Sequence, residues 1–583
     1  MRRALPLVVL AVPALFLPAA PDATRPDADR TMHGGTPARN MVNLTATGLS
    51  HEFPVGKGED GQPIRGLGDR VKWKATLGSR AYGGPVVFGG RVLVGTNNEN
   101  PRNKRDRDKP TEDQPERPPL NKGVVMCFRA SDGAFLWQMV HDKLASGQVN
   151  DWLREGVCST PAVEGNRAYY VSNRAEVVCL DLNGFADGNQ GFQGEKYRDP
   201  TDGDVVWSFD MIKEQSVFPH NMAACCPLLV GDLVFVVTSN GVDENHVNIP
   251  FPNAPSFLCL SKHTGRLIWK SSLPGKNVMH SQWSSPSYGV IGGRPQVIFA
   301  GGDGWLYAFE PETGNLIWKF DCNPKGAKYE LGGKGEKSDF IAMPVIYKGR
   351  VYIGTGQDPE HLEGVGHFWC IDPAGKEGDI SPDLVIDPSK DPPTVRVNPN
   401  SGLVWHYGGV DTRSYAKRDY VFSRTMSTAC IVDDVLYIAE LAGYVQCLDA
   451  RTGRKCWQWD TKSNIWGSCY YADGKVFVAN EDGDLYIFRH ERAPEILDEV
   501  AAGADAAVAA EQSARGQGKD EGAVRKAARD ARDAAIAAVR AKVKDKYLLQ
   551  VVEVGQAFRS TPVVAGDTLY LMAENTLYAI KAR

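Results

Sequence analysis

The sequence is 583 residues long, 42% of its residues are hydrophobic, and its formal net charge is -5. So small a charge for this length does not indicate nucleic-acid binding, and we expect no nucleic-acid partner. With 60 glycines and 36 prolines, turn signals run along the whole chain, which favours many short strands over long helices.

Residues 1–20 are predicted to be a signal peptide. Arg2 and Arg3 form a basic start, Leu5 to Leu17 form an apolar run, and Ala19-Ala20 precede a polar stretch. The apolar run is too short to span a bilayer, and no later segment is long and apolar enough to do so. We therefore expect an exported protein, periplasmic or secreted, without a transmembrane segment.

One pattern recurs along the rest of the chain. A Ser/Thr-Pro start leads into an apolar strand, a Gly or Asp turn, a second strand, a third strand and a T-G-x-x-x-W strand. Eight copies align, and a repeat of this length indicates a propeller or an array. Their first strands are predicted to contain Pro85, Pro161, Pro227, Pro286, Pro344, Ala429, Cys469 and Pro562. Their third strands are centred on Cys127, Cys179, Cys259, Ala308, Cys370, Cys447, Ile487 and Ala579.

The two ends of the chain complete one copy. The eighth copy stops at Arg583 without a fourth strand, and Val71 to Thr76, with Trp73, matches the missing strand. A blade completed by the opposite terminus closes a ring and removes its sheet edges. We therefore predict an all-β fold, an eight-bladed β-propeller of four-stranded W-motif blades over residues 71–583, closed by an N-terminal strand. Residues 21–70 are predicted to be an N-terminal extension.

An insertion interrupts the seventh copy. Residues 491–546 are rich in Ala, Arg, Asp and Glu, and we predict two helices there, about Pro494 to Ser513 and Gly522 to Lys546. The fourth strand of blade seven then follows at Tyr547 to Val554, without a Trp. This helical hairpin has a thin apolar stripe, so a docking contact with a partner and a solvated decoration both remain open.

Three long loops are predicted to join second to third strands. They span Asn97 to Gly123, Asn240 to Ser256 and Gln357 to Gly366, in blades one, three and five. Such loops share one face of a propeller and would build a wall around one mouth of its channel. Long loops on a rigid scaffold commonly carry binding sites. We expect an unknown protein or small-molecule ligand to bind at this long-loop face.

The repeat resembles that of the pyrroloquinoline-quinone (PQQ) family of β-propellers. The resemblance rests on the T-G-x-x-x-W spacing and the aromatic strands, and it covers nearly all of Val71 to Arg583. In that family the last-strand Trp stacks between neighbouring blades. The family includes quinoprotein alcohol dehydrogenases and also the outer-membrane assembly scaffold, which binds proteins without a cofactor. The resemblance therefore implies the fold and leaves the function open.

Several residues resemble the cofactor site of the quinoprotein dehydrogenases. Cys225-Cys226 resembles the vicinal disulfide that lies over PQQ, and Trp283 would join it if PQQ binds. The alternative is that two small residues replace Ser-Thr before the repeat's proline. Glu176 and Asn240 resemble calcium ligands of that family, but a calcium ion needs six to eight oxygen ligands.

The residues that such an enzyme needs for catalysis are missing. Ser284 follows Trp283 where the family has an aspartate base, and Ser cannot act as that base. Gly302-Asp303 replaces the expected cation near the quinone, and no C-x-x-C-H haem motif is present. We assign no catalytic residue and no certain cofactor. We favour a ligand- or protein-binding scaffold, with a PQQ- and calcium-dependent alcohol or sugar dehydrogenase of altered active site as the alternative.

Two mouth loops share an acidic-histidine composition. Such groups could bind a metal or a cationic ligand, or they could bond only their own turns. The residues are Asp243, Glu244 and His246 in one loop, and Asp358, Glu360, His361 and His367 in the other.

Overall fold

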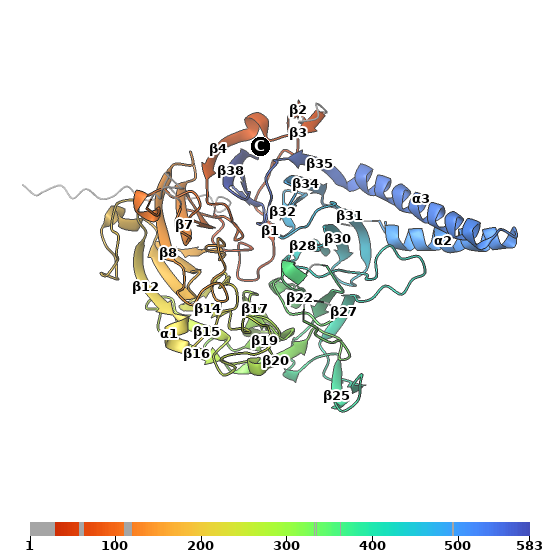
Figure 1. Ribbon diagram of the computed structural model, residues 1–583, viewed down its shortest axis with the longest axis horizontal. Helices are drawn as coiled ribbons and strands as arrows, with labels where there is room; N and C mark the ends of the chain where they lie inside the picture. The colour runs from red at the N-terminus through yellow and green to blue at the C-terminus, as the bar shows by residue number, and fades with distance from the viewer. Residues whose placement is uncertain are drawn as a thin grey trace, which may run out of the picture.

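Eight sheets, each built on four antiparallel strands, surround a central axis in the computed structural model, which confirms the predicted eight-bladed propeller (Figure 1). The predicted signal peptide, residues 1–20, lies outside the residues that the structure describes. The described residues are 29–57, 63–109, 119–331, 333, 335–361, 363–492 and 495–582.

Each blade uses four strands, and each first strand begins one residue after the position predicted from the repeat. Blade one comprises β5 (Val86–Phe88), β6 (Arg91–Asn97), β7 (Lys122–Arg129) and β8 (Phe135–Asp142), and blade two comprises β9 (Ala162–Glu164), β10 (Arg167–Val171), β11 (Glu176–Asp181) and β12 (Asp204–Asp210). Blade three comprises β13 (Leu228–Val230), β14 (Leu233–Val237), β15 (Phe257–Ser261) and β16 (Leu267–Ser271), and blade four comprises β17 (Ser287–Ile291), β18 (Arg294–Ala300), β19 (Trp305–Phe309) and β20 (Leu316–Asp321). Blade five comprises β21 (Val345–Tyr347), β22 (Arg350–Gly354), β23 (His367–Ile371) and β27 (Leu403–Gly408), and blade six comprises β28 (Cys430–Val432), β29 (Val435–Ala439), β30 (Tyr444–Asp449) and β31 (Lys455–Asp460). Blade seven comprises β32 (Tyr470–Ala472), β33 (Lys475–Ala479), β34 (Asp484–Arg489) and β35 (Leu548–Glu553), and blade eight comprises β36 (Val563–Ala565), β37 (Thr568–Met572), β38 (Thr576–Lys581) and β4 (Val71–Thr76).

Short elements decorate this ring. They are α1 (Met211–Gln215) after β12, β24 (Gly378–Asp379) beside β20, and the hairpins β2 (Val55–Lys57) with β3 (Pro63–Arg65) and β25 (Asp383–Asp387) with β26 (Thr394–Val397). In the described part of the chain, no helix has both the length and the apolar character needed to cross a membrane.

Every third strand carries a β-bulge at the same repeat position. The register shifts directly after the eight residues predicted as strand centres, from Cys127 in blade one to Ala579 in blade eight. In seven blades this residue lies opposite the fourth-strand Trp, and in blade seven Ile487 lies opposite Gln550. The five cysteines at this position are buried free thiols, as expected for core residues.

The T-G-x-x-x-W motif joins neighbouring blades. The indole of Trp73 donates a hydrogen bond of 2.9 Å to the carbonyl of Ala130 in blade one. Gly133, at φ +73°, lies against the same ring, where a Cβ would come within 2.5 Å of it. Trp207 meets Gly265 in the same way. The glycine is therefore needed both for its left-handed backbone and for the close approach of the tryptophan.

The N-terminal strand closes the ring as predicted. β4 is the fourth strand of blade eight and runs antiparallel to β38, with Trp73 opposite Ala579. The two ends of the chain therefore share one sheet, which closes the ring.

Residues 30–43, which we call the plug, lie across the axis of the propeller. The sequence predicted only an extension here. The plug hydrogen-bonds the first-strand region of every blade, and β1 (Val42–Asn43) adds to blade seven parallel to β32. The partners in blade order are Val87, Val163, Pro227, Tyr288, Ile346, Ile431, Tyr471 and Val564. One short segment therefore contacts the first-strand region of all eight blades.

The predicted helical hairpin projects from blade seven (Figure 1). It consists of α2 (Glu499–Gly516) and α3 (Glu521–Tyr547). α2 begins later than predicted because Asp498 caps it, accepting hydrogen bonds from the amides of the next turn. At the base of the hairpin, buried Glu499 accepts hydrogen bonds from Arg540 at 2.9 Å and from Gln458 in blade six at 3.0 Å.

Glu499→Gln is expected to lower the free energy of unfolding by about 2 kcal/mol. Breaking a fully buried ion pair costs about 3–5 kcal/mol, and Arg540 is one-quarter exposed, which reduces the loss. Urea unfolding followed by the helical circular dichroism signal measures the change. Asp505→Asn, at an exposed position of the same helix, is the matched control. An equal effect of both substitutions would contradict the role of the buried pair.

Candidate functional site

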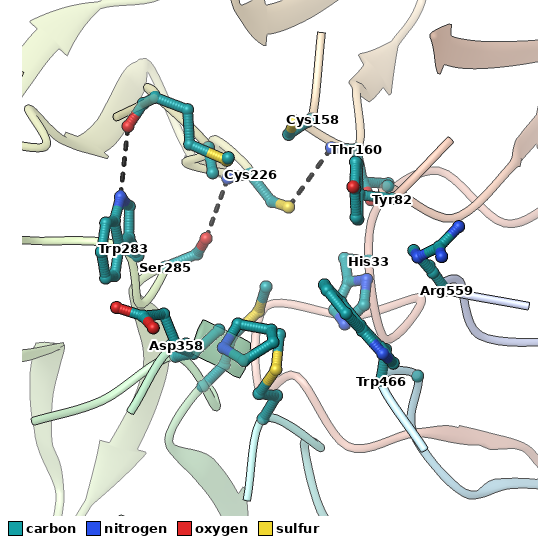
Figure 2. A pocket seen from close by; sticks show the side chains of 18 of the residues that line it. His33, Tyr82, Cys158, Thr160, Cys226, Trp283, Ser285, Asp358, Trp466 and Arg559 are labelled. Atoms are coloured by element: carbon teal, nitrogen blue, oxygen red, sulfur yellow. Dashed lines mark hydrogen bonds between the residues drawn. The ribbon is translucent and has the colours of Figure 1, made fainter. Parts of the chain in front are cut away.

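A cavity of about 260 Å³ lies at the long-loop mouth of the channel, and His33 of the plug lines it (Figure 2). Its wall repeats the symmetry of the fold, because each blade contributes one residue at the same repeat position. That position is three residues before the first-strand residue predicted from the sequence, as Tyr82 is before Pro85 in blade one. These eight lining residues are Tyr82, Cys158, Ala224, Trp283, Ile341, Met426, Trp466 and Arg559.

A ring of hydrogen bonds supports the cavity from behind. Thr160 Oγ1 accepts from the amide of Gly84 at 2.8 Å, and Cys226 Sγ accepts from the amide of Thr160 at 3.3 Å. Ser285 Oγ then accepts from the amide of Cys226 at 2.8 Å (Figure 2). Cys226 thus occupies a Ser/Thr position of the repeat, and its sulfur takes the place of a hydroxyl oxygen.

Cys225 and Cys226 are both buried free thiols in the structure. Cys225 Sγ accepts a hydrogen bond of 3.2 Å from the amide of Val237. Burial raises the pKa of Cys225 to about 12, so it stays protonated. Of the residues that resemble a quinone site, Cys226 and Trp283 reach the cavity.

The charge of the cavity lining is unbalanced. Three carboxylates line it, on Glu155, Asp358 and Glu360, against one guanidinium, on Arg559. Arg559 already pairs with Glu481 and Glu574, each at 3.0 Å. Burial lowers the pKa of His33 to about 3, so this imidazole is neutral. The described lining therefore offers no unpaired cation to an anionic ligand.

Aromatic rings form much of the wall. Tyr82, Trp152, Trp283 and Trp466 all line the cavity, and the Tyr82 and Trp466 rings have centroids 5.7 Å apart. The indole of Trp283 is oriented by a 3.2 Å hydrogen bond to the carbonyl of Met222 (Figure 2). Such walls are typical of sites that enclose an apolar or cationic group.

Three histidines meet beside this cavity. His220 and His280 lie in successive blade-to-blade connections, and His246 lies in the β14–β15 loop. Their ring centroids are 4.5–4.8 Å apart. His220 Nδ1 lies 2.8 Å from the carbonyl oxygen of Val242, so it carries the proton and leaves Nε2 as an acceptor. That Nε2 lies 3.1 Å from Nε2 of His246.

Asp358 links His280 to a fourth histidine. Its Oδ2 lies 2.7 Å from Nδ1 of His280 and 3.5 Å from Nδ1 of His361. Burial alone would raise the pKa of Asp358, but His280 and His361 leave it below its ordinary value. The side chain of Asp358 is therefore a carboxylate, shared between two imidazoles at the edge of the cavity.

Of the acidic-histidine loop residues, His246 joins His220 and His280 in one cluster, and Asp358 and His361 join His280 in a second. Glu360 lines the cavity. Asp243 accepts from the amide of Val247 within its own loop at 3.0 Å, and Glu244 is exposed on that loop. His367 lies apart and pairs with His406 at 2.9 Å.

The sequence analysis missed His220 and His280. Their positions did carry a signal, because they precede Pro227 and Pro286 by seven and six residues in equivalent connections.

The two residues that resemble calcium ligands are not joined by any contact among the described residues. Glu176 accepts from Arg174 at 3.2 Å, and Asn240 accepts from the amide of Phe218.

The ring of W-motif blades defines a PQQ-repeat β-propeller, and comparison with known families agrees. Residues 196–362 and 394–583 match the family described as outer membrane protein assembly factor BamB, and the chain belongs to this family.

Curated relatives match over shorter stretches. The chain is similar to quinoprotein alcohol dehydrogenase PedE of Pseudomonas putida, with 29% identity over 114 residues, 18% of this chain and 16% of that protein. It is also similar to quinoprotein ethanol dehydrogenase of Pseudomonas putida, with 26% identity over 132 residues, 22% of this chain and 19% of that protein. The chain thus spans less than one fifth of the length of either relative.

Solved structures are similar at low identity. BamB from Moraxella catarrhalis has a TM-score of 0.42 and 11% identity, covering 79% of this chain and 88% of that one. Quinohemoprotein alcohol dehydrogenase from Comamonas testosteroni has a TM-score of 0.38 and 12% identity, covering 79% and 77%.

Proposed function

We propose that this chain is an exported propeller that binds a small amphipathic molecule, neutral or cationic, in the mouth cavity. One observation carries the proposal. The aromatic lining holds three carboxylates and a single guanidinium that is already paired. The same mouth is the face where the long loops gather, and the plug closes the channel beneath it.

The physical basis is a favourable environment for positive charge. Indole and phenol rings attract a cation over their faces by about 0.5–2 kcal/mol, more as the site is desolvated. Carboxylates such as Glu155 add charge attraction, and the apolar walls take up the hydrophobic part of a ligand. An anionic ligand would face these carboxylates, and the described lining holds no free cation to compensate.

Charge-matched probes test this proposal. Tryptophan fluorescence of the full chain is titrated with benzyltrimethylammonium, benzyl alcohol and benzoate. The cation is expected to bind most tightly and benzoate least. Glu155→Gln should reduce the preference for the cation, whereas Glu244→Gln, on an exposed mouth loop, should leave it unchanged. Tighter binding of benzoate than of the cation would overturn the proposal.

The second candidate is a PQQ- and calcium-dependent dehydrogenase. It is favoured by Cys226 and Trp283, which both line the cavity (Figure 2). PQQ is a polycarboxylate, however, and the lining residues do not suit it, because Arg559 is paired with two glutamates. Calorimetric titration with PQQ, with and without Ca²⁺, followed by a dye-linked alcohol oxidation assay, decides between the candidates. Calcium-dependent binding with turnover would replace the first proposal with the second.

Export is the part of the proposal that rests on residues 1–20. Expression of the full chain in a Gram-negative host, followed by fractionation and N-terminal sequencing, tests it. A mature chain that begins near Pro21, in the periplasm or medium, is expected. A cytoplasmic chain that retains Met1 would contradict export.

A further inference from the structure

We propose that His220, His246 and His280 bind one transition-metal ion of the class that imidazole ligands favour, such as Zn²⁺ or Cu²⁺. The site lies beside the mouth cavity and does not depend on the ligand proposed for that cavity.

The three imidazoles are already close to metal-binding geometry. One ligand atom from each lies within 4.8 Å of the others, and the Nε2 atoms of His220 and His246 are 3.1 Å apart. Zinc–nitrogen bonds of about 2.0–2.1 Å in a tetrahedral site place two ligand nitrogens about 3.3 Å apart. A small rotation of these rings suffices to enclose an ion.

Two of the rings are oriented through their other nitrogen. His220 Nδ1 donates to the carbonyl of Val242, and His280 Nδ1 faces the carboxylate of Asp358 at 2.7 Å. Both contacts fix the tautomer that leaves Nε2 free to bind a metal. His280 is 2% exposed, and its Nε2 is buried with no hydrogen-bond partner among the described residues. A buried polar atom of this kind needs a partner, and an ion would supply it.

The loop that carries His246 holds it in place at some conformational cost. His246 has φ +59°, a backbone region that residues other than glycine seldom adopt. Its amide donates to the carbonyl of Asp243, whose carboxylate in turn binds the amides of Val247 and Asn248. A strained backbone of this kind persists where the surrounding contacts hold it. Here the loop conformation places the imidazole of His246 against that of His220.

The proposed ion adjoins the ligand cavity. Asp358 lines the cavity and contacts His280, and the Trp283 ring, which also lines the cavity, lies 4.9 Å from the His280 ring. Three histidine ligands leave the fourth tetrahedral position open for water or an added ligand. The carboxylate of Asp358 would offset part of the positive charge of the ion. The carboxylates of Glu155 and Glu360 then remain as the negative charges that face the cavity.

Cobalt substitution tests the site. The chelator-treated full chain is titrated with Co²⁺ and followed by visible absorption, then by displacement with Zn²⁺. We expect one Co²⁺ per chain with the intense bands of a four-coordinate site. His246→Ala should abolish the bands, and its partial burial makes it the variant least disruptive to folding. Asp358→Asn, at a positioning residue, should weaken binding by about 10–100-fold and keep the bands.

A matched control and a direct measurement complete the test. His263→Ala removes an exposed histidine paired with Asp232 and should change nothing. X-ray absorption of the zinc-loaded wild-type chain should show nitrogen ligation with imidazole scattering. Absence of Co²⁺ bands, unchanged binding by His246→Ala, or sulfur ligation of the zinc would each overturn the proposal.

Discussion

Arg39→Met is expected to lower the free energy of unfolding by about 4 kcal/mol. Arg39 is fully buried in the plug, and its guanidinium donates to four carbonyl groups. These belong to His33, Cys226, Pro227 and Pro286, at 2.8–3.1 Å. A buried carbonyl that loses its donor costs about 1–3 kcal/mol. Methionine fills similar space but restores none of these bonds.

The same substitution should also loosen the floor of the cavity. Arg39 connects the plug to blades three and four and holds the backbone of His33, whose side chain lines the cavity. We expect faster proteolysis within residues 30–43 and weaker binding of benzyltrimethylammonium.

Urea unfolding and limited proteolysis measure the two effects of Arg39→Met. Arg30→Met is the matched control, since Arg30 lies in the same plug but is only partly buried and bonds the side chains of Tyr470 and Thr45. Equal losses for both variants would mean that burial of the Arg39 guanidinium is not what secures the plug.

The plug shows why part of this fold escapes sequence analysis. The blades could be predicted because their motif residues meet one another, as Gly133 meets Trp73 across two blades. Backbone groups of the plug bond five of its eight first-strand partners, as where the amide of Tyr288 donates to the carbonyl of Pro37. The other three are bonded by the side chains of Arg39, Asn40 and Asn43. Any sequence offers backbone groups, and three isolated polar residues form no repeat, so no residue pattern marks the segment.

The candidate sites were predictable only in part, for a geometric reason. His246, Asp358 and His361 could be singled out because two mouth loops have similar composition. His220 and His280 are separated from each other by a whole blade, and only the ring brings them together. The cavity lining shares a repeat position but not a residue type, from Ala224 to Trp283, so composition does not reveal it.

Asp303 is expected to make the protein less stable as pH rises. It is 3% exposed, and burial raises its pKa to about 7 from an ordinary 3.8, although Tyr307 and Trp305 donate hydrogen bonds to it. Between these two values the folded chain binds one more proton than the unfolded chain. The contribution of protonated Asp303 to the free energy of unfolding is therefore fully present below about pH 4, and it is lost as pH rises through about 7. The shift corresponds to roughly 4 kcal/mol.

Asp303→Asn separates this effect from packing. Asparagine keeps the shape of the buried group but cannot ionise, so the variant should match the wild type near pH 4 and exceed its stability near pH 8. Urea unfolding across this range measures the difference, with Asp505→Asn, at an exposed position of α2, as the control. Tyr307→Phe removes a donor that favours the ionised carboxylate, so it should move the loss of stability to higher pH. A gain from Asp303→Asn that is the same at every pH would mean that Asp303 does not titrate in this range.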